Sequence, residues 1–338
     1  MYELIKTSPR SKARLGRLTT KRGTIDTPVF MPVGTQATVK ALDLRELNEI
    51  GTEILLGNTY HLFLRPGMDI IRKAGGLHRF MNWDKPILTD SGGFQVYSLA
   101  KIRKVRDDGV EFRSHLSGEM LFLGPKESMA IQRELGSDIA MLFDECPPHG
   151  ASAADLEAAV KRTLDWAAIC AEQPRAEGQL YFGIVQGEPH MPADKARYAM
   201  GLGTPAQLIE LVARGVDMFD CVLPTRVARN GTAYTSRGAI NLRASHQKEE
   251  FSPIEEGCEC FACTHHTRAY LRHLLKAGEI LGLRMLSVHN SHFFVEVMRD
   301  IRRHLAEGTF DSYREEFIGN YQPTSKVLEG RANSRLPK

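Results

Sequence analysis

The sequence lacks the features that mark secreted and membrane proteins. No run of 18 apolar residues occurs in its 338 residues, which argues against a membrane-spanning helix. Residues 1–10 contain no apolar stretch of the kind found in secretory signals, so we expect no signal peptide. Three of the six cysteines crowd into residues 258–263 and the others are scattered, which is not the pattern of a disulfide framework. These absences favour a reducing, cytoplasmic setting.

A large excess of charge is also missing. The formal net charge is +3 and the pI is about 8.5, so the sequence permits a nucleic-acid partner but does not by itself argue for one. A hydrophobic content of 42% and a charged content of 25% are ordinary for a globular protein. The length allows one large α/β domain or two smaller ones.

Short apolar runs recur along the chain, and stretches of helical period separate most of them. The runs are residues 27–34, 52–58, 86–90, 139–144, 180–186, 197–201 and 218–223. Helical period is clearest in residues 154–172, 205–214 and 283–305. This alternation predicts a parallel sheet covered by helices. Seven strands can be counted, one short of a closed eight-stranded βα barrel.

Polar residues stand at the ends of five of these runs, at Asn58, Asp90, Asp144, Gln186 and Asp220. In a closed βα barrel the carboxyl ends of all strands share one rim, and active sites form there. We therefore expect these side chains to gather at one rim. Asp90 and Asp220 would then be a candidate carboxylate pair for retaining glycosyl chemistry, with Asp144 and Gln186 reading a purine-like base.

Two segments depart from the simple repeat. Residues 101–124 contain turn signals between β-prone runs and predict an inserted antiparallel hairpin. Only residues 187–196 separate the run that ends at Gln186 from the run that begins at Arg197. A crossover between parallel neighbours needs a dozen or more residues, and two prolines prevent a helix here. Either these strands are not parallel neighbours, or a piece of the sequence is missing.

The stretch around Asp220 is the most informative. Residues 218–223 predict a buried strand, in which a carboxylate is costly unless it is paired or used. Thr225, Arg226, Arg229 and Asn230 follow in a predicted loop of phosphate-seeking donors. This pattern suggests anionic-sugar chemistry at a barrel mouth, although an N-capping or ion-paired aspartate before a solvated basic loop would explain it equally well.

A metal site is the strongest local signal. Its candidate ligands are Cys258, Cys260, Cys263 and His289. Three thiolates and one imidazole complete a tetrahedral zinc shell with no open position, which is a structural and not a catalytic site. Reduced surface cysteines with an unrelated histidine are the alternative. His265 and His266 are rival ligands, but they follow Cys263 too closely to close a good tetrahedron.

Two glycine-containing turns are weaker signals. The Gly-Gly turn in residues 89–95 would let a planar ligand approach the backbone and stack on Phe94, or it is a plain βα turn. In residues 201–205, Thr204 can cap a helix that has Pro205 at its first position. Such a helix N-terminus binds phosphate readily, although capping alone is the commoner reason for these residues.

Several motifs together resemble one family closely. They are residues 90–95, 143–146, 183–187 and 219–226, and the Cys-x-Cys-x2-Cys…His set. They are similar to those of queuine tRNA-ribosyltransferases, also called tRNA-guanine transglycosylases, from about residue 2 to about residue 320. The resemblance implies a single catalytic (β/α)8 TIM-barrel domain, 1–338, with an inserted zinc-binding subdomain at about 253–310 and one structural Zn²⁺ per chain.

The resemblance also implies a reaction and the roles of residues. Guanine at the wobble position of certain tRNAs would be exchanged for 7-aminomethyl-7-deazaguanine, a step toward queuosine. Asp220 is the expected nucleophile on the ribose anomeric carbon, and Asp90 the expected general acid/base. Residues expected at the base are Asn58, Ser91, Gly92, Gly93, Phe94, Asp144, Gln186 and Met200. Residues expected to contact RNA are Gly201, Gly203, Thr204, Thr225, Arg226 and Arg229. Cys146 follows the bacterial pattern.

One departure from the family is large. Between the counterparts of Gln186 and Arg197, the family carries a further strand, a Gly-Gly-Leu turn whose amides bind the base, and a helix. This sequence lacks that unit at the same place where residues 187–196 are too few for a crossover between parallel strands. Because a βαβ unit needs roughly 30 residues or more, we hypothesise an omitted or deleted βα unit.

Three functions remain open on the sequence alone. The chain is a transglycosylase, a catalytically silent tRNA-binding relative with an incomplete base pocket, or a sugar-cleaving barrel hydrolase. The Asp90 and Asp220 pair favours the first, and the missing unit favours the second. The zinc subdomain and the arginines disfavour the third. Family resemblance also implies a homodimer, through surfaces near residues 60–62 and near Tyr270 and His273, and no membrane partner.

Overall fold

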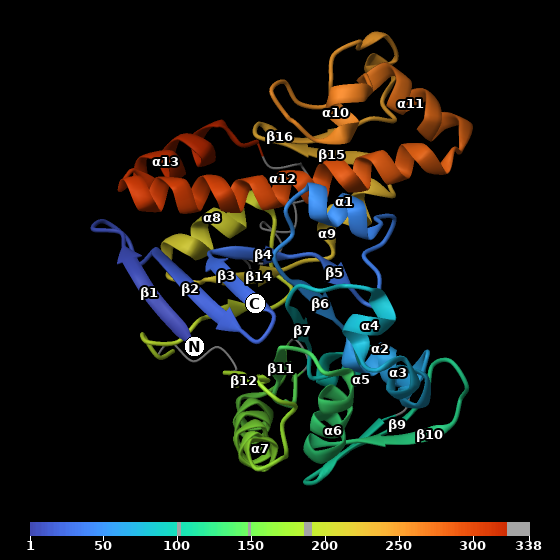
Figure 1. Cartoon of the computed structure of the whole chain (residues 1–338), viewed down its shortest axis with the longest axis vertical. Helices are drawn as coiled ribbons and strands as arrows, with labels where there is room; N and C mark the ends of the chain where they lie inside the picture. Colours follow the sequence, from blue (N-terminus) through green and yellow to red (C-terminus); the bar gives the residue numbers. More distant parts are fainter. Residues whose placement is uncertain (100–102, 148–149, 186–190, 323–338) are drawn as a thin grey trace.

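The computed structural model describes residues 1–99, 103–147, 150–185 and 191–322, and these form an α/β protein (Figure 1). All seven apolar runs contain strands, and the first run holds two, divided at Pro32. The strands are β4 (Val29–Met31), β5 (Val33–Gly34), β6 (Leu55–Gly57), β7 (Ile87–Thr89), β11 (Ile139–Met141), β12 (Leu180–Phe182), β13 (Tyr198–Ala199) and β14 (Met218–Asp220).

These strands pair in parallel in two sheets, in the orders β12-β11-β7-β6-β5 and β13-β14-β4. Because β4 and β5 are consecutive along the chain, the two sheets continue one another. Together they form an arc that runs from β12 to β13. Within the described residues the arc is open, since neither β12 nor β13 has a partner on its outer edge.

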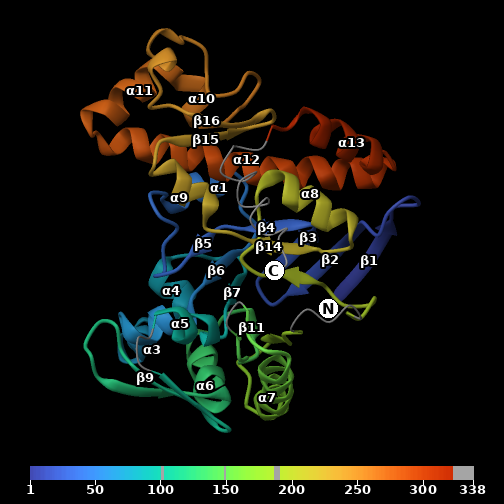
Figure 2. The same cartoon turned by 180° about the vertical axis from the view of Figure 1, so that it is seen from behind.

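Helices follow most of the strands and cover the sheets (Figure 2). Their bounds are α1 Leu44–Glu49, α2 Thr59–Leu64, α3 Met68–Ala74, α4 Leu77–Met81, α5 Gly93–Leu99, α6 Pro125–Leu135, α7 Ala153–Ala171, α8 Pro205–Ala213 and α9 Leu223–Ala228. The helices predicted at 154–172 and 205–214 are confirmed as α7 and α8. The α/β class is therefore confirmed, while a closed eight-stranded barrel stays a prediction.

Two antiparallel sheets flank the arc. β1 (Tyr2–Thr7), β2 (Arg14–Thr20) and β3 (Gly23–Thr27) form one. β8 (Arg103–Arg106), β9 (Gly109–Arg113) and β10 (Met120–Leu123) form the other, which confirms the predicted antiparallel insertion in 101–124 for the residues described there.

The C-terminal region packs on one end of the molecule, opposite α6 and α7 (Figure 1). It contains β15 (Thr232–Thr235), β16 (Gly238–Asn241), the 3-10 helix η1 (Ser245–Glu249), α10 (Phe261–His265), α11 (Arg268–Ala277), α12 (Ile280–Glu307) and α13 (Phe310–Asn320). The predicted helix at 283–305 lies within α12. Two of its arginines contact the N-terminal part of the chain: Arg299 donates to the Ile50 carbonyl, and Arg302 donates to Glu53 and the Pro28 carbonyl.

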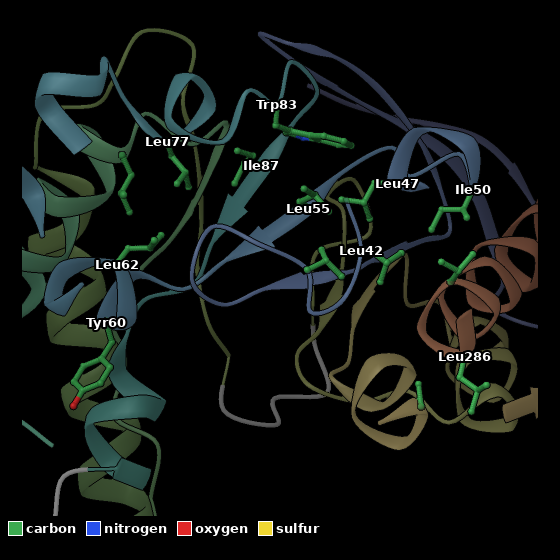
Figure 3. Close-up of a cluster of buried hydrophobic side chains, with 14 of the residues drawn as sticks. Leu42, Leu47, Ile50, Leu55, Tyr60, Leu62, Leu77, Trp83, Ile87 and Leu286 are labelled. Carbon is green, nitrogen blue, oxygen red and sulfur yellow. The ribbon is translucent and has the colours of Figure 1, made fainter. Parts of the chain in front are cut away.

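The largest hydrophobic cluster joins the strands to these helices. Leu55 from β6, Ile87 from β7 and the Trp83 side chain are fully or almost fully buried in it, and Leu286 from α12 belongs to the same cluster (Figure 3). This packing holds the strand ends in fixed positions relative to α12. Among the described residues, no helix is both long enough and apolar enough to span a membrane.

Candidate active site and metal centre

Asp90 directly follows β7 and is almost fully buried. Its Oδ1 accepts a hydrogen bond from the Thr59 backbone N–H at 2.9 Å, and its Oδ2 accepts one from the Asn58 side-chain amide. Asn58 follows β6 and caps α2 by accepting from the His61 N–H at 3.0 Å. The adjacent strand end therefore fixes the orientation of the Asp90 carboxyl group, and the predicted support from Asn58 has a structural basis.

The environment of Asp90 favours its protonated form. Burial raises its pKa to about 7, and the negative charges of Asp220 and Asp144 add to the rise, against hydrogen bonds from backbone N–H groups that lower it. The charges of Asp220 and Asp144 both act on Asp90, so both of these carboxyl groups lie within electrostatic reach of it. A carboxyl group that titrates near neutral pH can both donate and accept a proton.

Asp220 is the last residue of β14 and is also buried. Its Oδ1 accepts two hydrogen bonds, from the Tyr198 hydroxyl at 2.6 Å and from the Gly201 backbone N–H at 2.7 Å. Burial raises the pKa of Asp220, and these two donors oppose the rise. Sequence reasoning missed Tyr198. The sequence does contain one signal for it. Side chains two residues apart on a strand share a face, so Tyr198 lies on the same face as Met200, which is expected at the base.

Asp144 lies beyond the end of β11, beside the Gly-Gly turn. Its Oδ1 accepts a hydrogen bond from the Ser91 hydroxyl at 2.9 Å, and that hydroxyl accepts from the Gly93 N–H at 3.1 Å. A Cβ at residue 93 would lie 2.5 Å from the Asp144 carbonyl oxygen, so only glycine fits. Gly92 has a φ of +83°, which a residue with a side chain rarely adopts. The turn thus brings Asp144 and Asp90 to the same end of the sheet.

Three cysteines and one histidine meet between α10 and α12. The ligand atoms of Cys258, Cys260, Cys263 and His289 all lie within 4.8 Å of one another. His289 Nδ1 lies 3.8, 3.5 and 3.3 Å from the three Sγ atoms in that order. Zinc bonds of about 2.3 Å to sulfur and 2.0 Å to nitrogen place tetrahedral ligands roughly 3.5 to 3.8 Å apart, so these separations fit a metal ion.

The rest of this centre supports the same assignment. His289 Nε2 lies 2.7 Å from the Tyr234 carbonyl oxygen, so it is the protonated nitrogen and Nδ1 is free to bind a metal. His265 stacks on Phe261 instead, and His266 also lies outside the cluster. The four predicted ligands therefore come together, and the cluster can hold a metal ion.

The chain is similar to known proteins along most of its length. A profile of the queuine tRNA-ribosyltransferase family matches residues 10–190 and 188–323. A queuine tRNA-ribosyltransferase of Moorella thermoacetica is 50% identical over 363 residues, which cover 95% of this chain and 97% of that protein. One of Natranaerobius thermophilus is 48% identical over 365 residues (95% and 99%), and one of Halalkalibacterium halodurans is 47% identical over 372 residues (96% and 98%).

The chain belongs to the queuine tRNA-ribosyltransferase family. With this family established, the remaining predicted positions can be placed around the carboxyl groups. Phe94, at the start of α5, is 54% exposed, and Met200, after β13, is 38% exposed, so both stand at the surface beside buried acids. A small cavity of about 90 Å³ is lined by Gly93, Asp144 and Cys146. Gln186 lies outside the described residues.

The segment after Asp220 corrects the sequence prediction. The strand ends at Asp220 and not at residue 223, and Leu223–Ala228 is the helix α9 and not a loop. Proline stops a strand but is accepted in the first turn of a helix, where its missing N–H is not needed. Arg226 is exposed on α9, and Arg229, at its C-cap, donates to the Thr225 carbonyl at 2.9 Å.

The remaining family-based positions stay predictions as RNA contacts, and the structure describes their local conformation. Thr204 caps α8 through the Gln207 N–H, with Pro205 in the first turn, as predicted. Gly203 packs closely against Leu208 and Cys221. Near the positions expected at homodimer surfaces, Tyr60 and Leu62 are fully buried within the chain, whereas Tyr270 is exposed. The homodimer stays a prediction. Tyr60 is directed inward because its hydroxyl lies 2.8 Å from His115 Nδ1.

Proposed function

We propose that this protein is a tRNA-guanine transglycosylase of queuosine biosynthesis, which exchanges guanine at the tRNA wobble position for 7-aminomethyl-7-deazaguanine through a covalent tRNA–Asp220 intermediate. The observation that carries the proposal is the pair of buried carboxyl groups, Asp90 and Asp220, at the carboxyl ends of β7 and β14. Their environments differ in the way that two roles require, since Asp90 titrates near neutral pH with both oxygens hydrogen-bonded, whereas the two donors to Asp220 share one oxygen.

In the first half of the reaction, an Asp220 oxygen attacks the ribose anomeric carbon C1′. The C1′–N9 bond to guanine breaks and its electron pair goes to guanine, which takes a proton from neutral Asp90. In the second half, the incoming base gives its N9 proton to Asp90, bonds to C1′ and releases Asp220 as a carboxylate. The proton count balances because Asp90 ends the cycle as it began.

The base binds beside Asp144. Asp144, oriented by Ser91, accepts hydrogen bonds from the base edge, and the close backbone of Gly92 and Gly93 leaves room for a planar ring. Phe94 and Met200, exposed at the surface, cover its two faces when tRNA is bound. Gln186 completes the edge contacts.

The anticodon arm binds along the segments that follow β13 and β14. Arg226 on α9 and Arg229 at its C-cap supply positive charge to phosphates, and Thr225 lies in the first turn of the same helix. The α8 N-terminus, which follows Gly201, Gly203 and Thr204, adds the partial positive charge of the helix dipole. The working unit is a single catalytic domain, assembled as a homodimer in the cytoplasm.

The metal is zinc, with one ion per chain. When bound, it cross-links the segment before α10 to α12 and stabilises the region of about 253–310 as a subdomain. We expect His289→Ala to lose the ion and to lower the melting temperature by roughly 10 °C or more. Elemental analysis and calorimetry measure both.

His265→Ala is the matched control for the metal, because His265 is close in sequence but outside the cluster. It should keep one zinc per chain and the wild-type melting temperature. Retention of zinc by His289→Ala would disprove the assignment.

We also propose that the arc of strands is an eight-stranded βα barrel that lacks one unit between β12 and β13. The alignment with the Moorella relative runs over 363 residues, more than the 338 in this chain, and the two family matches meet at residues 188–190. On α7, the apolar side chains Leu156, Val160 and Leu164 are exposed at a four-residue spacing, which is one helix face without a cover in the described structure.

Restoring the unit is expected to improve base binding. A chimera that carries the extra Moorella segment between Gln186 and Met191 should have a KM for guanine at least tenfold lower, because each hydrogen bond to the base contributes about 1 kcal/mol or more. Steady-state kinetics with unmodified tRNA measure this change. An insertion of equal length rich in glycine and serine is the control. Equal KM values for both chimeras would contradict the missing unit.

The function itself is tested by incorporation of labelled guanine into unmodified tRNA. Wild-type protein should label a tRNA that has guanine at the wobble position and leave unlabelled the same tRNA with adenine there. Labelling of both or of neither would contradict the proposal.

A further inference from the structure

We propose that Tyr198 is a positioning residue that selects which oxygen of Asp220 attacks the ribose and that assists the release of this carboxylate. The inference rests on the proposed transglycosylase function and adds a residue to it. Tyr198 lies on β13, next to β14, with its Cα opposite Met218. From there its hydroxyl reaches the end of the neighbouring strand.

The two hydrogen bonds to Asp220 converge on one oxygen. The Tyr198 hydroxyl, at 2.6 Å, and the Gly201 N–H, at 2.7 Å, both donate to Oδ1. Within the described parts of the chain, Oδ2 accepts no hydrogen bond from another residue. Because Oδ1 has its acceptor sites occupied, Oδ2 is the oxygen that is free to bond to C1′.

Tyr198 keeps its proton throughout. Burial, followed by the negative charges of Asp220 and Asp90, raises the pKa of Tyr198 well above its ordinary value. The phenol is therefore a fixed donor and not an acid that takes part in proton transfer. Gly201, with a φ of +68°, turns the chain so that its N–H points to the same oxygen.

The donors act differently in the two halves of the reaction. When Oδ2 bonds to C1′, the carboxylate becomes an ester, its negative charge is lost, and Oδ1 becomes the ester carbonyl oxygen. When the incoming base bonds to C1′, the C1′–Oδ2 bond breaks and its electron pair returns to the carboxylate. A hydrogen bond to Oδ1 is stronger to the carboxylate than to the ester. It therefore lowers the barrier to release, in which the charge returns to the carboxylate, and raises the barrier to attack, in which that charge is lost.

The test is Tyr198→Phe, which removes the hydroxyl and keeps the ring. Loss of one hydrogen bond to a charged group predicts breakdown of the covalent intermediate that is slower by about tenfold, with formation that is no slower than in the wild type. Formation is followed by rapid quench with labelled tRNA on denaturing gels. Breakdown is followed by adding guanine to the preformed intermediate. In the steady state, the covalent species should accumulate in the variant.

Two further variants separate this role from a structural one. Tyr181→Phe, on β12, removes a hydroxyl that donates to the Pro174 carbonyl at 3.2 Å, away from Asp220, and should leave both rates unchanged. Site-specific 3-fluorotyrosine at residue 198 supplies a more acidic phenol of nearly the same shape, and breakdown should become faster. That variant keeps the test decisive if Tyr198→Phe does not fold.

The outcomes distinguish the inference from the function on which it rests. The wild type could form the intermediate while the ratio of its breakdown rate to its formation rate stays the same in Tyr198→Phe and in the fluorotyrosine protein. That result would overturn the role of Tyr198 alone. Absence of any covalent intermediate in the wild type would overturn the proposed function and the inference with it.

Discussion

Asp220→Asn is expected to abolish guanine exchange, with a loss of roughly 10⁴-fold or more, because an amide is a far weaker nucleophile than a carboxylate. The substitution preserves the local fold, since the amide oxygen can still accept from Tyr198 and from the Gly201 N–H. Incorporation of labelled guanine into tRNA, together with Kd for tRNA, measures the effect. Binding should be retained while exchange is lost.

Asp165→Asn is a suitable control for this substitution, because Asp165 is exposed on α7 and pairs only with Lys161 in the described structure. It should exchange guanine at the wild-type rate. Exchange by Asp220→Asn within tenfold of wild type would assign the nucleophile to another residue.

Asp90→Asn should lower kcat by roughly 10²- to 10⁴-fold, since the departing guanine then receives no proton from the protein. The pH dependence is the sharper readout. Asp90 must be protonated to act as the acid, and its pKa is about 7. The rate of intermediate formation in the wild type should therefore be highest below pH 7 and fall as the pH rises through that value.

In Asp90→Asn this titration should disappear and the residual rate should not depend on pH across the same range. The measurement is single-turnover formation of the intermediate from about pH 5 to pH 9. A variant that keeps the wild-type pH profile would show that another group supplies the proton.

Much of this site could be predicted because parallel strands impose a simple rule. Their carboxyl ends meet at one edge, so polar residues that end apolar runs come together without any knowledge of their contacts. Asn58, Asp90 and Asp220 follow that rule. The metal cluster could also be predicted from the sequence, because three cysteines at close spacing and one later histidine, His289, are typical of a zinc site.

Other features depend on contacts that sequence patterns do not carry. Tyr198 acts across a strand pair, so its role follows from pairing register and not from its neighbours in sequence. Pro224 can either end a strand or stand in the first turn of a helix. The sequence does not distinguish these two cases, and the structure places it in the first turn of α9. Arg302 lies in the predicted helix at 283–305, and its contact with Glu53, near the start of β6, does not follow from helical period.

The most direct test of the two-aspartate mechanism is the mass of the covalent intermediate. Wild-type protein is incubated with unmodified tRNA in the absence of free base, denatured, digested with ribonuclease and protease, and mapped by mass spectrometry. The account predicts a ribonucleotide adduct on the peptide that contains Asp220, no adduct in Asp220→Asn, and loss of the adduct when guanine is added. Guanine exchange without an adduct, or an adduct on a different residue, would contradict it.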